Sequence, residues 1–304
     1  MRADASPRSL DGVRVRCARG AVGCICQPDR ARALPQSPLI VRFLDVGDGD
    51  ATWISLPDGE TALVDCGPAS YGKQLVLRLE AAGIDRLDQL IITHGAANAA
   101  GGCGDVLAHM VVGSLTWNGL GGDAQVWGPL QSQIQYYGAA VQAPSTAAPV
   151  DFGGARLTAF QRQPDGTPND AFDSGLVVLL EYGGWRTLLP GAIHADGELN
   201  VVRSGLGYPI HILEVGDGGS EAASSDAFLQ AILRPDLGTS CRAAVSSQAA
   251  DRRGSPTASS VYSRFGSGLC GQVFVTADNG TVVAQVTADG SEPRVSAERN
   301  VVRY

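Results

Sequence analysis

The sequence lacks any apolar run long enough to cross a membrane, so we expect no membrane-spanning helix. Its N-terminus is rich in Arg but has no apolar stretch of the kind that forms the core of a secretory signal. These two absences predict a soluble protein without a membrane segment, which we place in the cytoplasm. An extracytoplasmic location is the alternative if the start site is misassigned.

Paired cysteine motifs are also missing. The seven cysteines are scattered over the chain, at positions 17, 24, 26, 66, 103, 241 and 270. Their odd number and the absence of a CxxC pair argue against a disulfide framework and against a structural zinc site. We therefore expect reduced thiols.

Basic residues are scarce over most of the chain. Residues 1–42 hold eight Arg and three acidic residues, a net charge of +5, whereas the remaining 262 residues hold 15 basic and 28 acidic residues, a net charge of −13. An acidic body offers no positive surface to a phosphate backbone, so a nucleic acid is an unlikely partner. An unknown protein or small molecule is the expected partner.

The composition is that of a globular protein with a sizeable core: 44% of the 304 residues are hydrophobic and 18% are charged. Residues 1–38 are rich in Arg, Pro, Ser and Ala without periodicity, which predicts a disordered or poorly ordered arm. We expect one domain over residues 39–290 and a C-terminal tail over 291–304.

Periodicity and turn residues predict mixed β-sheets flanked by helices. Hairpins are indicated by Gly153-Gly154, by Gly183-Gly184 and, near the end of the chain, by Asp278-Asn279-Gly280. Strands are expected at 39–46, 51–56, 61–65, 87–93, 111–117, 150–160 (a hairpin), 176–182, 185–189, 209–215, 242–246, 272–276 and 281–286. Helices are expected at 71–82, 104–110, 130–137, 195–203, 225–233 and 256–265.

One short stretch carries most of the functional information. Leu90-Ile91-Ile92 is an apolar run that ends in Thr93-His94 and is followed by small residues up to Gly102. This pattern predicts a buried strand that ends in a loop and opens a helix, and ligands bind at such strand ends in α/β proteins. His94 at this place suggests a metal ligand, although a hydrogen bond at the strand end is its simpler role.

Six blocks in order resemble the metallo-β-lactamase domain of ComEC-type DNA-uptake competence proteins. They are Phe43–Ala51, similar to "FLDVGQGDA"; Thr61–Gly67, similar to "(T)VLIDGG"; Leu90–Gly102, similar to "LVLTHPDADHIGG"; Ser174–Ala192, similar to "SLVLRLEYGGFRFLLTGD"; Glu214–Ser220, similar to "KVPHHGS"; and Arg252–Pro256, similar to "RYGHP". The resemblance implies a four-layer αββα sandwich with two mixed β-sheets. It also implies a hydrolase whose zinc or manganese ions activate a water molecule.

The same resemblance implies that the metal site is degenerate. Three positions keep a side chain that matches or could replace a family ligand: His94, Asn98 and Asp217. Five further ligand positions have lost their donors: Ala96, Ala99, Ala192, Gly218 and Ser255. His194 lies close to Ala192 but two residues out of register. A catalytic zinc needs about three protein ligands, so no metal cofactor is expected, and weakly bound zinc or manganese is the alternative.

We therefore interpret the chain as a non-catalytic pseudoenzyme that keeps the scaffold for binding or assembly. One alternative is a metal-dependent hydrolase, phosphodiesterase- or nuclease-like, with rearranged ligands that include His94 and Asp217. A second alternative is a metal-free hydrolase with a Cys or Ser nucleophile. In that case Cys66 would attack the substrate, His94 would act as its base and Asp65 or Asp217 would orient the base.

Overall fold

The computed structural model describes residues 15–20, 23–28, 37–117, 122–137, 140–142, 149–161, 175–203, 208–235, 241–247, 258–266 and 268–299. Within the segment predicted to be a disordered arm, β1 (Val15–Gly20) and β2 (Gly23–Pro28) pair as an antiparallel hairpin in a sheet of their own. The arm therefore contains regular structure at these residues, where Gly20 and Gly23 favour a tight reversal of the chain. The predicted domain limits stay a prediction.

The first large sheet has eight strands, antiparallel at one end and parallel at the other. In spatial order they are β17 (Arg294–Ala297), β16 (Val282–Val286), β3 (Leu39–Phe43), β4 (Thr52–Ser55), β5 (Thr61–Val64), β6 (Arg86–Ile92), β7 (Val111–Trp117) and β8 (Ala140–Gln142).

The second large sheet has seven strands and the same mixed character. In spatial order they are β15 (Cys270–Val275), β14 (Cys241–Ser246), β13 (Ile212–Glu214), β12 (Trp185–Leu189), β11 (Leu176–Tyr182), β10 (Ala155–Gln161) and β9 (Val150–Phe152).

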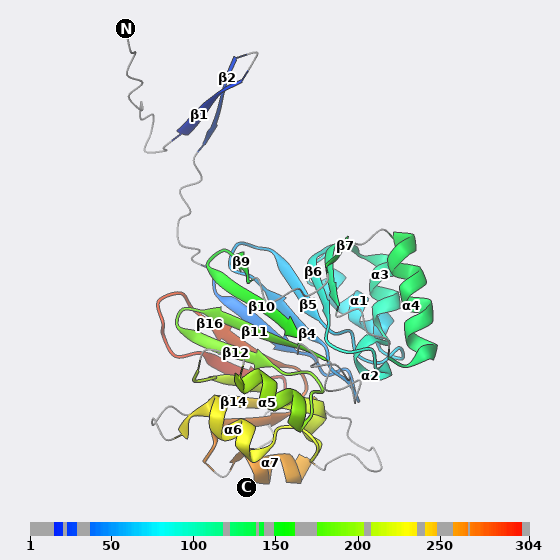
Figure 1. Ribbon diagram of the computed structural model, residues 1–304, viewed down its shortest axis with the longest axis vertical. Coiled ribbons are helices and arrows are strands. Elements are labelled where there is room, and N and C mark those ends of the chain that lie inside the picture. The colour runs from blue at the N-terminus through cyan, green and yellow to red at the C-terminus, as the bar shows by residue number, and fades with distance from the viewer. Residues whose placement is uncertain are drawn as a thin grey trace.

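Helices cover the outer face of each sheet (Figure 1). The eight-stranded sheet packs against α1 (Gly72–Ala81), α3 (Cys103–His109) and α4 (Ala124–Tyr137). The seven-stranded sheet packs against α5 (Ala195–Arg203), α6 (Asp226–Leu233) and α7 (Ala258–Gly266). Three short helices lie at strand ends: α2 (Ala97–Ala100), the 3₁₀ helix η1 (Gly216–Gly219) and α8 (Thr276–Asn279).

Three apolar clusters fill the spaces between these layers. The first lies between the two sheets, and the other two lie between each sheet and its helices. Along β6, Leu90 and Ile92 face the helices while Ile91 faces the other sheet, so the whole apolar run is buried. The predicted αββα sandwich is confirmed. Among the described residues no helix is long and apolar enough to span a membrane.

The predicted hairpin over residues 272–286 is wrong. Strand β15 pairs in parallel with β14, whereas β16 pairs with β3 in the other sheet. Between them, Asn279 is buried and its side-chain oxygen accepts hydrogen bonds from the Val275 N–H and the Tyr262 hydroxyl. The Asp-Asn-Gly signal therefore ends a short helix that carries the chain from one sheet to the other.

Candidate functional site

The candidate site lies where strands of both sheets end. Asp65 follows β5, Thr93 and His94 follow β6, and Asp217 lies in η1 after β13. The Gly-rich turn before β4 adds Asp50, whose N–H donates to the carbonyl oxygen of Asn98 at 3.1 Å. The arrangement thus matches the strand-end position expected from the sequence.

A buried chain of hydrogen bonds fixes His94. The Asp65 carboxyl accepts from the Thr93 N–H at 2.8 Å and from the Thr93 hydroxyl at 2.5 Å. The Thr93 hydroxyl oxygen lies 2.9 Å from His94 Nδ1. Burial lowers the pKa of His94 to about 4, a hydrogen bond with the Asn98 side chain raises it, and the charge of His194 lowers it again. His94 is therefore a neutral imidazole whose ring orientation is set by its neighbours.

The structure brings His194 to Asp217, although its sequence position is two residues away from a family ligand position. His194 Nε2 lies 3.4 Å from Asp217 Oδ2, and both side chains are about a quarter exposed, at 23% and 26%. Asp217 has a φ of 47°, a left-handed conformation that Asp tolerates better than most residues. His194 also lies near enough to His94 for its charge to lower the pKa of that imidazole.

Most positions that the resemblance assigns to family ligands carry side chains without donor atoms. Ala99 and Ala192 are buried, with exposed fractions of 0% and 2%. Ala96 is the N-cap of α2 and makes no side-chain cap hydrogen bond, and Gly218 has a φ of 58°. Ser255 lies outside the described residues. Within the described part of the chain, no three His, Cys, Asp or Glu side chains form a group that could hold a metal ion. The donor set does not fit a zinc or manganese ion.

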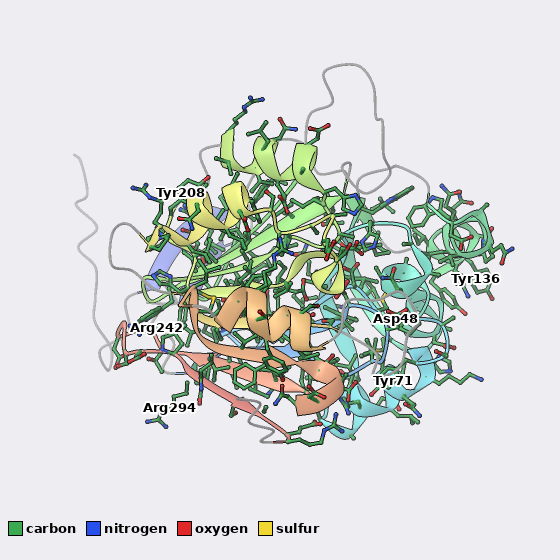
Figure 2. All side chains as sticks on the ribbon, turned by 90° about the horizontal axis from the view of Figure 1, so that it is seen from below. Asp48, Tyr71, Tyr136, Tyr208, Arg242 and Arg294 are labelled. Atoms are coloured by element: carbon green, nitrogen blue, oxygen red, sulfur yellow. A yellow bond between two sulfur atoms is a disulfide. The ribbon has the colours of Figure 1, made fainter. Side chains whose placement is uncertain are left out.

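Three carboxyls at the site form a buried cluster that was not recognised from the sequence. They belong to Asp50, Asp65 and Glu214, each at most 5% exposed. Burial raises the pKa of Asp50 to about 7, and the nearby Asp217 and Asp48 add to this rise while a Ser247 hydrogen bond opposes it. Asp48 lies in the same turn, two residues before Asp50 (Figure 2).

Burial also raises the pKa values of the other two carboxyls, those of Asp65 and Glu214. Burial raises the pKa of Asp65 to about 8. It also raises the pKa of Glu214 well above its usual range, and repulsion from Asp50 and Asp65 adds to this rise. Glu214 comes from one sheet and accepts a 3.1 Å hydrogen bond from Thr52 of the other. No local sequence pattern marks this cluster. Asp50 and Asp65 come together through the pairing of β4 with β5, and Glu214 joins them only through the packing of the two sheets.

The expectation of reduced thiols is wrong for four of the seven cysteines. Disulfides join Cys66 to Cys103 and Cys241 to Cys270. The hypothesis of a Cys66 nucleophile is therefore also wrong, because a disulfide sulfur is no thiolate. The pairing escaped sequence analysis because the partners lie 37 and 29 residues apart without a motif.

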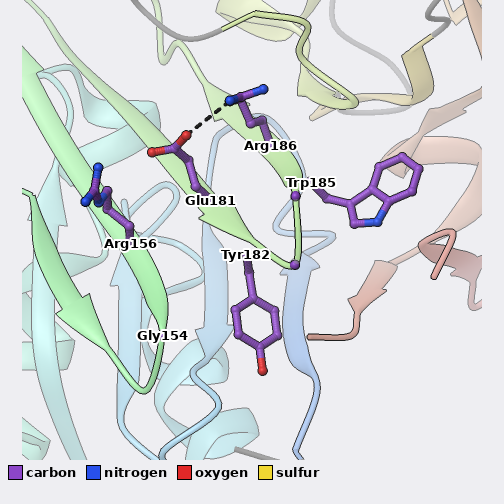
Figure 3. A pocket seen from close by; sticks show the side chains of 8 residues that line it. Gly154, Arg156, Glu181, Tyr182, Trp185 and Arg186 are labelled. Atoms are coloured by element: carbon purple, nitrogen blue, oxygen red, sulfur yellow. Dashed lines mark hydrogen bonds and ion pairs between the residues drawn. The ribbon is translucent and has the colours of Figure 1, made fainter. Parts of the chain in front are cut away.

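A cavity of about 280 Å³ lies elsewhere, at the β9–β10 and β11–β12 hairpins (Figure 3). Its charged lining comes from Arg156, Glu181 and Arg186, which lie opposite one another across three neighbouring strands. Glu181 pairs with Arg186 at 3.1 Å. None of the lining residues belongs to the candidate site.

Comparison with known proteins places this geometry in a class. No family model matches the sequence. A solved structure, that of Tm1679, a metal-dependent hydrolase of the β-lactamase superfamily, superimposes with a TM-score of 0.51 at 14% identity and covers 78% of this chain and 95% of that one. The protein has the metallo-β-lactamase fold.

Sequence similarity points to a particular relative. ComE operon protein 3 of Bacillus subtilis (strain 168) is 25% identical over 209 residues. The match covers 62% of this chain but 26% of that protein, so the chain spans about a quarter of the length of the relative. The resemblance to ComEC-type proteins predicted from the sequence is confirmed.

Proposed function

We propose that the protein is a non-hydrolytic relative of the ComEC-type metallo-β-lactamase domain, a pseudoenzyme that uses the scaffold to bind a protein or a small molecule. The observation that carries this proposal is the donor set at the strand ends: Ala96, Ala99 and Ala192 replace three ligands, and Gly218 replaces a fourth. Side chains without donor atoms cannot hold an ion. The strands and turns that build the site are formed, so the proposed loss concerns only the side chains that would bind metal.

A second candidate function rests on the contact between His194 and Asp217, which lies near enough to His94 for the two imidazoles to interact through their charges. Two imidazoles and a carboxylate are a common ligand set for catalytic zinc. If these side chains turned toward one ion, the protein would be a metal-dependent hydrolase with rearranged ligands. The neutral state of His94 leaves its ring electronically suited to such a role.

Metal content separates the two candidates. The purified protein is dialysed against zinc or manganese without chelator, and bound metal is measured by elemental analysis for the wild type and for His94→Ala. His109→Ala is the matched control, because His109 is exposed on α3 and its Nδ1 lies 2.8 Å from the Asp105 carbonyl oxygen of the same helix. We expect far less than one ion per chain in all three proteins.

Near-stoichiometric metal in the wild type and in His109→Ala, lost in His94→Ala, would refute the pseudoenzyme proposal. Hydrolysis of bis-p-nitrophenyl phosphate by the metal-loaded wild type would do the same.

We also propose that the protein works in an oxidising, extracytoplasmic compartment. The supporting observation is the pair of buried disulfides, since disulfides persist mainly outside the reducing cytosol. The acidic body remains a poor surface for nucleic acid.

A further inference from the structure

The Cys66–Cys103 disulfide lies inside the candidate site. Cys66 directly follows Asp65, and Cys103 begins α3, nine residues after His94. Both cysteines are fully buried, with exposed fractions of 0%. The bond therefore joins the loop after β5 to the loop and helices after β6, the two segments that carry the first part of the site.

Backbone contacts make the same junction tight. The Cys66 N–H donates to the Ala99 carbonyl oxygen at 2.8 Å, and the Gly102 N–H donates to the Gly67 carbonyl oxygen at 2.9 Å. A side chain at Gly102 would collide with the carbonyl oxygen of Cys66. The two loops thus touch along their backbones, with the disulfide at the centre of the contact.

The second disulfide provides a contrast. Cys241 and Cys270 lie opposite each other on β14 and β15, which are already joined by a parallel ladder of hydrogen bonds. That bond repeats a connection that the sheet itself makes. The Cys66–Cys103 bond instead connects the loop after β5 to the first residue of α3, two segments that lie beyond the ladder of β5 and β6.

The loops of this site need such a connection. In a metal centre, an ion bound by ligands from several loops cross-links those loops. Here few donors remain, and three buried carboxyls lie in these loops or next to them, where ionisation of two of them would make them repel each other. A covalent bond at the junction supplies the link that an ion would otherwise supply.

We propose that the Cys66–Cys103 disulfide, in place of a metal ion, holds the loops of the candidate site together, so that the site keeps this shape only under oxidising conditions. This inference rests on the proposed loss of the metal. It assigns different roles to two disulfides that close loops of similar length, 37 and 29 residues apart in sequence. Chain entropy alone would give the two bonds nearly the same effect on stability.

Hydrogen–deuterium exchange followed by mass spectrometry tests the proposal. The proteins compared are the wild type with and without EDTA, Cys66→Ala/Cys103→Ala, and the matched control Cys241→Ala/Cys270→Ala. We expect exchange in residues 65–72 and 94–103 to rise about tenfold or more in the first double variant, because local opening becomes easier. The control variant should leave these two segments unchanged, and EDTA should have no effect.

Unchanged exchange in the site loops of Cys66→Ala/Cys103→Ala would overturn the proposal and leave the proposed function standing. A rise on EDTA alone would show a resident metal and would overturn the proposed function. If the double variant fails to fold, alkylation of the wild type decides: we expect all four paired cysteines to resist iodoacetamide in denaturant until a reductant is added. Free Cys66 and Cys103 thiols in the folded, non-reduced protein would refute the cross-link.

Discussion

At the scale of single residues, the buried carboxyls distinguish this site from an ordinary strand end. Asp50, Asp65 and Glu214 each accept a hydrogen bond from a hydroxyl, which partly compensates their burial. A neutral carboxylic acid is the form that such an environment favours. The cluster should therefore stay protonated in the folded protein at a pH where the unfolded chain is fully ionised.

The free energy of unfolding should consequently fall as pH rises through neutrality. The folded protein binds more protons than the unfolded chain between the ordinary carboxyl pKa, 3.8 for Asp, and the raised values of about 7 for Asp50 and about 8 for Asp65. His94 and His211, whose pKa values are lowered to about 4, act in the opposite direction up to about pH 6.5. The fall should be steepest between about pH 6.5 and pH 8.

Urea unfolding at several pH values checks this, with Glu214→Gln as the variant. The glutamine keeps an acceptor for Thr52 and removes one ionisable group from the cluster. We expect the wild type to lose at least ~1 kcal/mol between pH 6.5 and pH 8, and the variant to lose less. Glu80→Gln, on the exposed side of α1, should follow the wild type. Parallel curves for the wild type and Glu214→Gln would contradict a protonated cluster.

At the scale of elements, part of the predicted C-terminal tail forms a strand of the sheet. Strand β17 extends the eight-stranded sheet, and Arg299 follows it. The Arg299 guanidinium donates to the carbonyl oxygens of Thr276, Ala277 and Asp278 and to Asp45 Oδ2. One side chain thus binds the carbonyl oxygens of α8 and connects them to the turn that precedes the site.

Removal of this side chain should therefore loosen the end of the sheet. We expect Arg299→Ala to lower the free energy of unfolding by about 1 kcal/mol, since its side chain is half exposed and its hydrogen bonds are partly replaced by water. Arg294→Ala is the control, because Arg294 is exposed on β17 (Figure 2). Thermal unfolding of the two variants measures the difference. Equal melting temperatures would show that the Arg299 contacts add no stability.

Elements with a strong local signal could be predicted residue by residue, but the strands that pair with them could not. The hairpin of β11 and β12 and helix α5 begin and end where the sequence placed them. Ser225 is the N-cap of α6, with its hydroxyl accepting from the Phe228 N–H. The edge strands β8 and β17 were missed, because a short strand at the end of a sheet leaves little periodicity in the sequence. The predicted hairpin at 272–286 was wrong because turn residues indicate where the chain reverses but not which strands pair.

At the scale of the whole molecule, the fold could be predicted from six short blocks, whereas the site could be predicted only in part. His94 was found because its place after an apolar run has a local signature. The contact between His194 and Asp217, the disulfides and the carboxyl cluster join residues that are far apart in the chain. Their recognition required the pairing of strands within each sheet and, for Glu214, the packing of the two sheets. Glu214 and Thr52, for example, are 162 residues apart.

If only the metal-binding side chains have been lost and the backbone of the site is intact, restoring carboxylate ligands should restore metal binding. The variant Ala96→Asp/Asn98→Asp/Ala192→Asp adds three carboxylates beside His94, His194 and Asp217. Asp at position 96 also suits the N-cap of α2, whereas Asp at the buried position 192 should cost about 1–3 kcal/mol without a metal. We therefore expect the variant to be less stable than the wild type in EDTA and to regain stability with Zn²⁺.

The measurement is the melting temperature with EDTA and with increasing Zn²⁺. At a free Zn²⁺ concentration one hundred times the dissociation constant, binding adds about 2.7 kcal/mol, which is several degrees in a protein of this size. A control with Asp at three exposed alanines, Ala81, Ala82 and Ala222, should not respond to Zn²⁺. A response of the unmodified protein equal to that of the variant would mean that a competent metal site was already present. No response in either would mean that the strand ends have moved too far from the geometry of the fold for donors alone to rebuild the centre.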